Sequence, residues 1–137
     1  MENDGKIYDK RLSEQKRFSI VARAKSFHFA FRGLKLILKT QHNFLAQIFL
    51  TISVLLMGLY FNISQTEWMI LVLSAGLVLM AEAFNTAFEF DIDLTSPTYH
   101  PYARDTKDVA AGAVLITVIM ACVIGLIIFL PKIAHLL

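Results

Sequence analysis

The sequence predicts an all-α membrane protein that has an N-terminal amphipathic surface helix and three transmembrane helices. Hydrophobic residues make up 56% of the 137 residues, and the mean hydropathy of +0.58 is well above that of an ordinary soluble domain. Ten of the thirteen Lys and Arg residues come before residue 40, and three long apolar runs follow. This order is typical of a chain that first lies on a membrane surface and then crosses the membrane.

The individual elements follow from charge and periodicity. Residues 1–17 are charged and lack apolar periodicity, so we expect a flexible tail. Residues 18–39 repeat Phe and Leu at helical spacing between cations, which predicts the surface helix, although a helix packed on a soluble core would give a similar pattern. The three apolar runs are each long enough to cross about 30 Å of hydrocarbon, which predicts transmembrane helices at 44–61, 68–88 and 109–130. A single domain covering 18–133 is expected.

The distribution of cations predicts how the chain is oriented. The link at 62–66 carries no Lys or Arg, whereas the N-terminal region and the 89–108 connection hold twelve of the thirteen cations. The positive-inside rule therefore predicts a cytoplasmic N-terminus and an external C-terminus. The net charge is only +2, and the cations are interleaved with apolar residues, which favours a membrane surface over nucleic acid as the partner. A single cysteine, Cys122, provides no disulfide framework.

A row of polar residues closes the second apolar run. Glu82, Asn85, Glu89 and Asp93 are spaced by three, four and four, which predicts one stripe on a helix, with Thr86 at its edge. Unpaired ionisable groups at membrane depth cost several kcal/mol, so the stripe suggests a functional site. Mg²⁺ carried by a nucleotide would supply the counter-charge, because Mg²⁺ takes one or two carboxylates and bridges phosphate oxygens. In a competing interpretation, Lys or Arg side chains from neighbouring helices pair with these carboxylates and only specify packing.

The segment after this stripe, TSPTYHPYARDTKD, is predicted to be a cytoplasmic loop. It supplies Tyr99, His100, Arg104 and Lys107, which could stack on a purine ring or donate to phosphate oxygens. A juxtamembrane loop whose cations only fix the topology would look similar. The sequence contains neither a GxxxxGK[ST] loop nor the glycine loop of protein kinases, so the common phosphate-binding motifs are missing.

With these motifs in view, residues 18–130 resemble the prokaryotic integral-membrane diacylglycerol kinase family, which includes the undecaprenol kinases of Gram-positive bacteria. The resemblance rests first on the spaced signature formed by Glu82, Asn85, Thr86, Ala87, Glu89 and Asp93. It rests also on Tyr99-His100, on Lys107-Asp108 and on the Ala-Ala-Gly-Ala-Val run that follows.

The resemblance implies a homotrimer whose active sites are shared between neighbouring subunits. It implies that Glu82 is the general base on the lipid hydroxyl and that Glu89 binds the divalent metal of MgATP. The implied nucleotide contacts are Glu89, Tyr99, His100, Lys107 and Asp108, and the residues implied to support the site or the substrate are Asn85, Thr86 and Asp93.

The sequence departs from the family pattern at three places. Gln41 stands where members commonly have a second metal-binding Glu, and it offers a neutral carbonyl oxygen but no charge. Leu45 stands where a basic residue is expected. In relatives an N-terminal Arg contacts the nucleotide, and the corresponding position in this sequence lies between Arg23 and Lys25.

The function predicted from these features is an ATP-dependent lipid kinase of the bacterial cytoplasmic membrane, with Mg²⁺ bound as MgATP. It would transfer the γ-phosphoryl group to the hydroxyl of diacylglycerol and so form phosphatidic acid. Undecaprenol is the alternative substrate. A small ion or proton transport protein would also explain an acidic stripe, and a membrane scaffold would need no chemistry at all, but neither accounts for the Tyr-His and Lys-Asp pairs.

Overall fold

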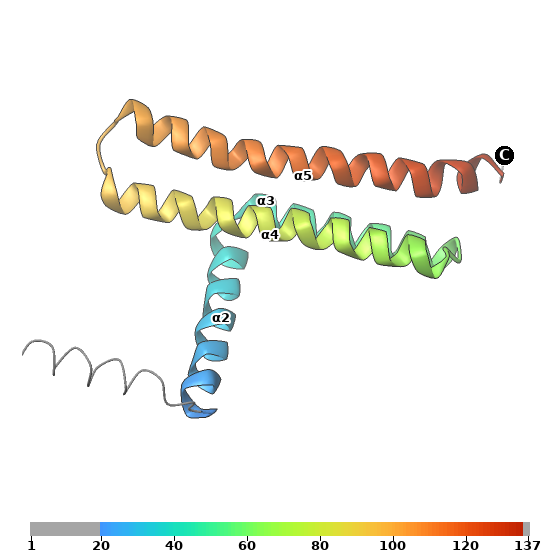
Figure 1. Ribbon diagram of the computed structural model, residues 1–137, viewed down its shortest axis with the longest axis horizontal. Helices are drawn as coiled ribbons and strands as arrows, with labels where there is room; N and C mark the ends of the chain where they lie inside the picture. The colour runs from blue at the N-terminus through green and yellow to red at the C-terminus, as the bar shows by residue number, and fades with distance from the viewer. Residues whose placement is uncertain (1–19, 136–137) are drawn as a thin grey trace, which may run out of the picture. The chain divides into compact units, whose positions relative to one another are not determined.

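The computed structural model describes residues 20–135, which form four α-helices and short links (Figure 1). The helices are α2 (Ile20–Thr40), α3 (His42–Tyr60), α4 (Gln65–Thr95) and α5 (Pro101–Ala134). The chain divides into two units, Met1–Leu36 and Ile37–Leu137, so that most of α2 belongs to the first unit and α3, α4 and α5 belong to the second. The tail expected at 1–17 lies outside the described residues.

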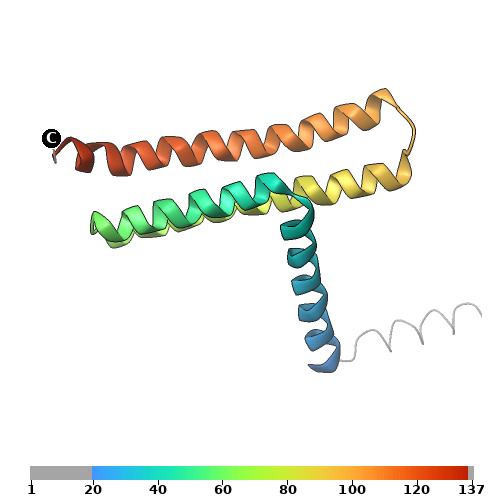
Figure 2. The ribbon, with the colours of Figure 1, turned by 180° about the vertical axis from the view of Figure 1, so that it is seen from behind.

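Helices α3, α4 and α5 form the second unit, in which both α3 and α5 pack against α4 (Figures 1 and 2). All three are long and apolar enough to cross a membrane. The number of predicted transmembrane helices is therefore confirmed by length and composition. Many large apolar side chains of these helices face outward, including Leu73 at 66% and Ile127 at 69% relative exposure, which suits a hydrocarbon environment.

The helix boundaries differ most from the sequence prediction at the end of α4 and the start of α5. Helix α4 continues to Thr95 instead of ending near residue 88, and α5 begins at Pro101 instead of residue 109. Hydropathy marks where apolar residues end, but a helix continues wherever its backbone hydrogen bonds are made, and Pro at the first position favours a helix start. The predicted loop therefore shrinks to residues 96–100, and Arg104 and Lys107 lie on α5.

Polar contacts fix the opposite end of the bundle, where α3 turns into α4. Ser64 caps α4, because the Glu67 backbone N–H donates to Ser64 Oγ at 3.3 Å while the Ser64 N–H donates to Glu67 Oε2 at 2.7 Å. Lys132 Nζ, near the end of α5, donates to Glu67 Oε1 at 2.9 Å. The same carboxylate thus caps α4 and ties it to α5.

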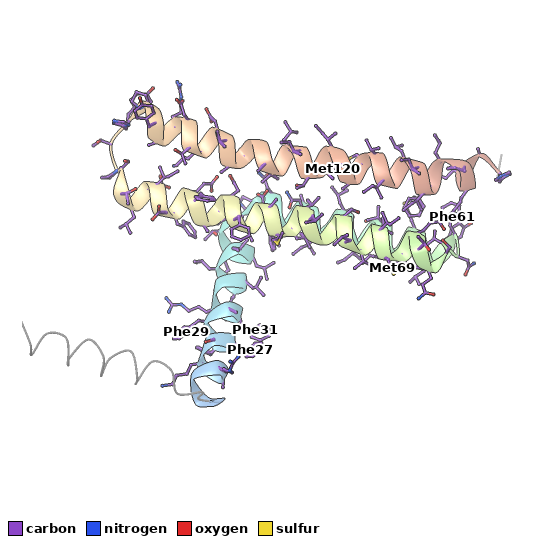
Figure 3. The ribbon with its side chains drawn as sticks, in the orientation of Figure 1. Phe27, Phe29, Phe31, Phe61, Met69 and Met120 are labelled. Carbon is purple, nitrogen blue, oxygen red and sulfur yellow. The ribbon has the colours of Figure 1, made fainter. Side chains whose placement is uncertain are left out.

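A small apolar core packs beside this capped end. It consists of the buried side chains of Ile63, Leu71, Ile128 and Phe129. The rings of Phe61 and Phe129 lie 6.0 Å apart between centroids, and Figure 3 labels Phe61 at this end of the bundle. Gly58 is needed here, because an added Cβ would lie 2.9 Å from the Trp68 ring. This packing holds α3, α4 and α5 together at the end opposite the acidic stripe.

Helix α2, described by itself, exposes aromatic side chains. Phe27, Phe29 and Phe31 are 68%, 61% and 69% exposed. Figure 3 labels Phe29 on the opposite side of α2 from Phe27 and Phe31, so apolar groups extend beyond the stripe expected from the sequence. The amphipathic surface role of this helix stays a prediction.

Candidate active site

The acidic stripe lies on one continuous helix, as predicted, because α4 runs unbroken from Gln65 to Thr95. Glu82 is only 4% exposed, and Asn85 and Thr86 beside it are also buried. Glu89, two turns further on, is half-buried, and Asp93 is exposed near the end of the helix. The stripe therefore runs from a buried carboxylate to an exposed one.

The buried carboxylate of Glu82 is held from α3. Gln47 Nε2 donates to Glu82 Oε2 at 3.0 Å. Thr86 Oγ1 donates to the backbone carbonyl of Glu82 at 2.9 Å, so this hydroxyl is occupied within α4. No sequence motif includes Gln47; the signal available for it is a polar residue inside an otherwise apolar run.

The half-buried carboxylate of Glu89 is held by two amides, one on each oxygen. Gln41 Nε2 donates to Glu89 Oε2 at 3.1 Å, and Asn85 Nδ2 donates to Glu89 Oε1 at 3.1 Å. The residue that departs from the family pattern, Gln41, thus lies directly beside the predicted metal ligand. Asn85 reaches the same carboxylate from within α4.

Neither Glu82 nor Glu89 forms a salt bridge within residues 23–135, and their side-chain partners there are neutral amides. Among the described residues, the pairing foreseen by the competing interpretation occurs at Asp93, which binds Lys107, and no such pair is formed by Glu82 or Glu89. Ionised carboxylates at these positions have to be balanced by positive charge. A bound cation would do this.

The groups around Glu89 contain oxygen atoms of the kind that Mg²⁺ binds, although the two amides now turn their N–H groups toward the carboxylate. The carboxylate is accompanied by two amide side chains, and Asn85 Oδ1 is buried without a hydrogen-bond partner among the described residues. Mg²⁺ takes oxygen ligands, and proteins usually hold it through one or two carboxylates while it keeps several waters. The described residues contain no group of three or more His, Cys, Asp or Glu side chains placed to hold a metal. Water and phosphate oxygens would have to complete the coordination, as in a metal–nucleotide complex.

The predicted nucleotide residues lie where α4 ends and α5 begins. Lys107 forms an ion pair with Asp93, which links the start of α5 to the end of the acidic stripe. A carboxylate oxygen of Asp108 lies 4.0 Å from the guanidinium nitrogen Nε of Arg104. In the linker, Tyr99 is 77% exposed and His100 is also exposed.

The structure thus brings some of the predicted site residues together and leaves others apart. Gln41 and Asn85 are both hydrogen-bonded to Glu89, and Lys107 reaches Asp93. Glu82 lies on the same helix but is bonded instead to Gln47 and Thr86. No hydrogen bond or ion pair within residues 23–135 links Tyr99 or His100 to the stripe. The ring of His100 instead lies 5.6 Å from that of Tyr102.

A bundle of three membrane-crossing helices, with a stripe of carboxylates that begins inside the bundle, defines a small membrane protein that has a polar site within its helices. Residues 28–129 match the model of the family described as prokaryotic diacylglycerol kinase. The chain belongs to this family.

Relatives with recognised activities support the family assignment. The chain is 42% identical over 108 residues to the undecaprenol kinase of Bacillus subtilis, covering 79% of this chain and 88% of that protein. It is 34% identical over 113 residues to the diacylglycerol kinase of Synechocystis, covering 82% of this chain and 65% of that protein, slightly under two thirds of its length. It is 28% identical over 109 residues to a diacylglycerol kinase of Helicobacter pylori, covering 74% of this chain and 85% of that protein.

Family membership identifies a lipid kinase, which is a transferase of the membrane that uses a nucleotide together with a metal. The predicted resemblance is therefore confirmed, and the kinase interpretation is favoured over ion transport. The relatives are divided between two lipid substrates.

Proposed function

We propose that the protein transfers the γ-phosphoryl group of MgATP to the hydroxyl group of a membrane lipid. The observation that carries this proposal is the pair of carboxylates on α4, Glu82 and Glu89, which are held by neutral amide side chains. Glu82 takes the proton from the lipid hydroxyl. The hydroxyl oxygen then bonds to the γ-phosphorus, and the bond to the bridging oxygen breaks, so that ADP leaves with the electron pair.

The remaining site residues take supporting roles in this proposal. Glu89 would hold Mg²⁺, with the amide oxygens of Gln41 and Asn85 as candidate neutral ligands, and the metal would offset phosphate charge. Lys107 contributes a second positive charge, positioned by Asp93. Further contacts to ATP are assigned to Tyr99, His100 and Asp108, while Thr86 fixes the backbone at Glu82.

We further propose that three copies of the chain assemble, with the active site on the cytoplasmic face of the bacterial cytoplasmic membrane. The charge distribution supports a cytoplasmic N-terminus and an external C-terminus. The exposed linker that carries Tyr99 and His100 supports assembly, since a neighbouring subunit could cover a nucleotide held there. A lipid hydroxyl near the headgroup plane would meet Glu82 from the membrane side.

Of the two lipids, we propose undecaprenol as the preferred substrate. The sequence alone favoured diacylglycerol. The undecaprenol kinase shares 42% identity over 88% of its length, against 34% over 65% for the cyanobacterial diacylglycerol kinase. Purified protein in mixed micelles should be assayed with both lipids at the same mole fractions. We expect kcat/KM to be at least about tenfold higher for undecaprenol, and a higher value for diacylglycerol would reverse the order. Phosphorylation of neither lipid would contradict the kinase proposal.

Lys107→Met should impair the use of ATP while leaving lipid affinity unchanged. Loss of a charged donor to phosphate is expected to raise the KM for ATP by about tenfold or more. Asp93 is exposed, so losing its partner should not unfold the protein. The kinase rate is measured against ATP at saturating lipid and against lipid at saturating ATP. A change confined to the KM for lipid would refute the phosphate role.

Gln41→Glu should lower the Mg²⁺ requirement. The new carboxylate would stand beside Glu89, which Gln41 now contacts at 3.1 Å. One more partly solvated carboxylate should stabilise bound Mg²⁺ by on the order of 1 kcal/mol, so the apparent Mg²⁺ requirement should fall about fivefold to tenfold. Turnover need not rise, because tighter ground-state binding does not by itself speed the chemical step.

This prediction is tested by measuring the rate against free Mg²⁺ at fixed ATP. Gln65→Glu is the matched control, since Gln65 is an exposed residue at the opposite end of α4. The control should titrate like the wild type. An unaltered or higher Mg²⁺ requirement in Gln41→Glu would mean that residue 41 does not face the metal.

A further inference from the structure

Gln47 occupies a position on α3 that the sequence motifs did not identify. It lies half-buried within the first transmembrane helix, and its Nε2 donates to Glu82 Oε2 at 3.0 Å. Its Oε1 is buried and has no hydrogen-bond partner among the described residues. A buried amide oxygen without a hydrogen-bond partner destabilises the folded protein, which suggests that Gln47 has a functional role.

The side-chain N–H group of Gln47 suits the Glu82 carboxylate, which must stay able to accept a proton. Within residues 23–135, Gln47 is the one side chain that donates to the Glu82 carboxylate. A Lys or Arg in its place would form an ion pair and hold the negative charge. The neutral amide fixes one carboxylate oxygen, Oε2, and leaves the charge and the other oxygen available for a proton.

The carbonyl oxygen Oε1 of Gln47, which has no hydrogen-bond partner among the described residues, suits the protonated state of Glu82. Once Glu82 has accepted the proton of the lipid hydroxyl, its carboxyl group becomes a donor. Rotation of the Gln47 amide by half a turn would exchange the N–H for the carbonyl oxygen, which can accept from that donor. A glutamine can therefore satisfy a buried acid both before and after proton transfer, which an apolar residue cannot do.

We infer that Gln47 is a positioning residue that holds the general base Glu82 in its reactive orientation and satisfies it in both protonation states. The inference rests on the proposed function, in which Glu82 accepts the hydroxyl proton.

Gln47→Met tests the inference, because methionine has a similar length but cannot donate to Glu82. We expect kcat to fall about tenfold or more, with the dependence on ATP and Mg²⁺ unchanged. Gln41→Met is the matched comparison, since it makes the same change on the same stretch of chain beside Glu89. That variant should instead raise the Mg²⁺ requirement. A wild-type kcat in Gln47→Met, or a shift in its Mg²⁺ titration like that of Gln41→Met, would overturn the inference.

Gln47→Asn provides a second test that keeps the amide and removes one methylene. Because the present hydrogen bond spans 3.0 Å, the shorter side chain should lose it, and kcat should fall as in Gln47→Met. A wild-type kcat in Gln47→Asn would contradict the positioning role, even if the methionine variant could not be purified.

Infrared spectroscopy gives a readout that does not depend on turnover. The carboxylate stretching band that disappears in Glu82→Gln should shift in frequency in Gln47→Met, because the hydrogen bond to that carboxylate is lost. An unshifted band would argue against the contact. The two proposals fail separately: a wild type that phosphorylates neither lipid would refute the kinase function, whereas an active wild type with an equally active Gln47→Met would refute only the role of Gln47.

Discussion

Glu82→Gln is expected to give a folded protein that forms lipid phosphate at less than about a hundredth of the wild-type rate, because a general base contributes about 10² to 10⁴ in rate. Glutamine keeps the size of the side chain, and its carbonyl oxygen can still accept from Gln47 Nε2, which now lies 3.0 Å from the carboxylate. The packing around this buried position is therefore preserved. What is lost is the proton acceptor.

The measurement is kcat for lipid phosphorylation, accompanied by size-exclusion chromatography and thermal unfolding in detergent. Glu67→Gln is the matched control, because it makes the same substitution on the same helix at the capped end, where Glu67 binds Lys132 at 2.9 Å. It should leave turnover near the wild-type value while lowering thermal stability slightly. Near-normal turnover of a well-folded Glu82→Gln would remove Glu82 from the role of base.

Glu89→Ala should weaken the binding of MgATP and raise the Mg²⁺ requirement by at least about tenfold, because it removes the charged ligand proposed for the metal. The substitution also leaves the amides of Gln41 and Asn85 without their shared acceptor. The affinity for lipid should change little, since the lipid hydroxyl is assigned to Glu82.

The rate is measured against free Mg²⁺ at fixed ATP, and then against lipid at saturating MgATP. Asp91→Ala is the control, because Asp91 is an exposed carboxylate on the same helix. Its Mg²⁺ titration should match that of the wild type. An unchanged titration in Glu89→Ala would place the metal elsewhere.

The sequence was sufficient to predict the three transmembrane helices and the acidic stripe. Predominantly apolar runs of about 20 residues have few alternatives to a membrane-crossing helix, and spacings of three and four place polar groups on one helical face. The ends of the helices were harder to predict. Hydropathy falls at the membrane boundary, yet α4 and α5 continue beyond it as helices, to Thr95 and from Pro101.

The contacts between helices could not be predicted from the sequence. Glu82 and Glu89 were identified from their spacing on α4, but their partners Gln47 and Gln41 come from α3, and no local pattern relates the two segments. Gln41 was noted only because it departs from the family pattern. The nucleotide contacts at Tyr99 and His100 stay predictions, because both residues are exposed here.

The central claim is tested most directly by the stoichiometry of the reaction of the purified wild-type protein. The protein is supplied with γ-³²P-labelled ATP, Mg²⁺ and either undecaprenol or diacylglycerol in micelles, and both ADP and labelled lipid are quantified. We expect one lipid phosphate for each ADP formed, with no reaction when Mg²⁺ is chelated. Formation of ADP without labelled lipid, or no turnover with either lipid, would contradict the assignment of this chain as a lipid kinase.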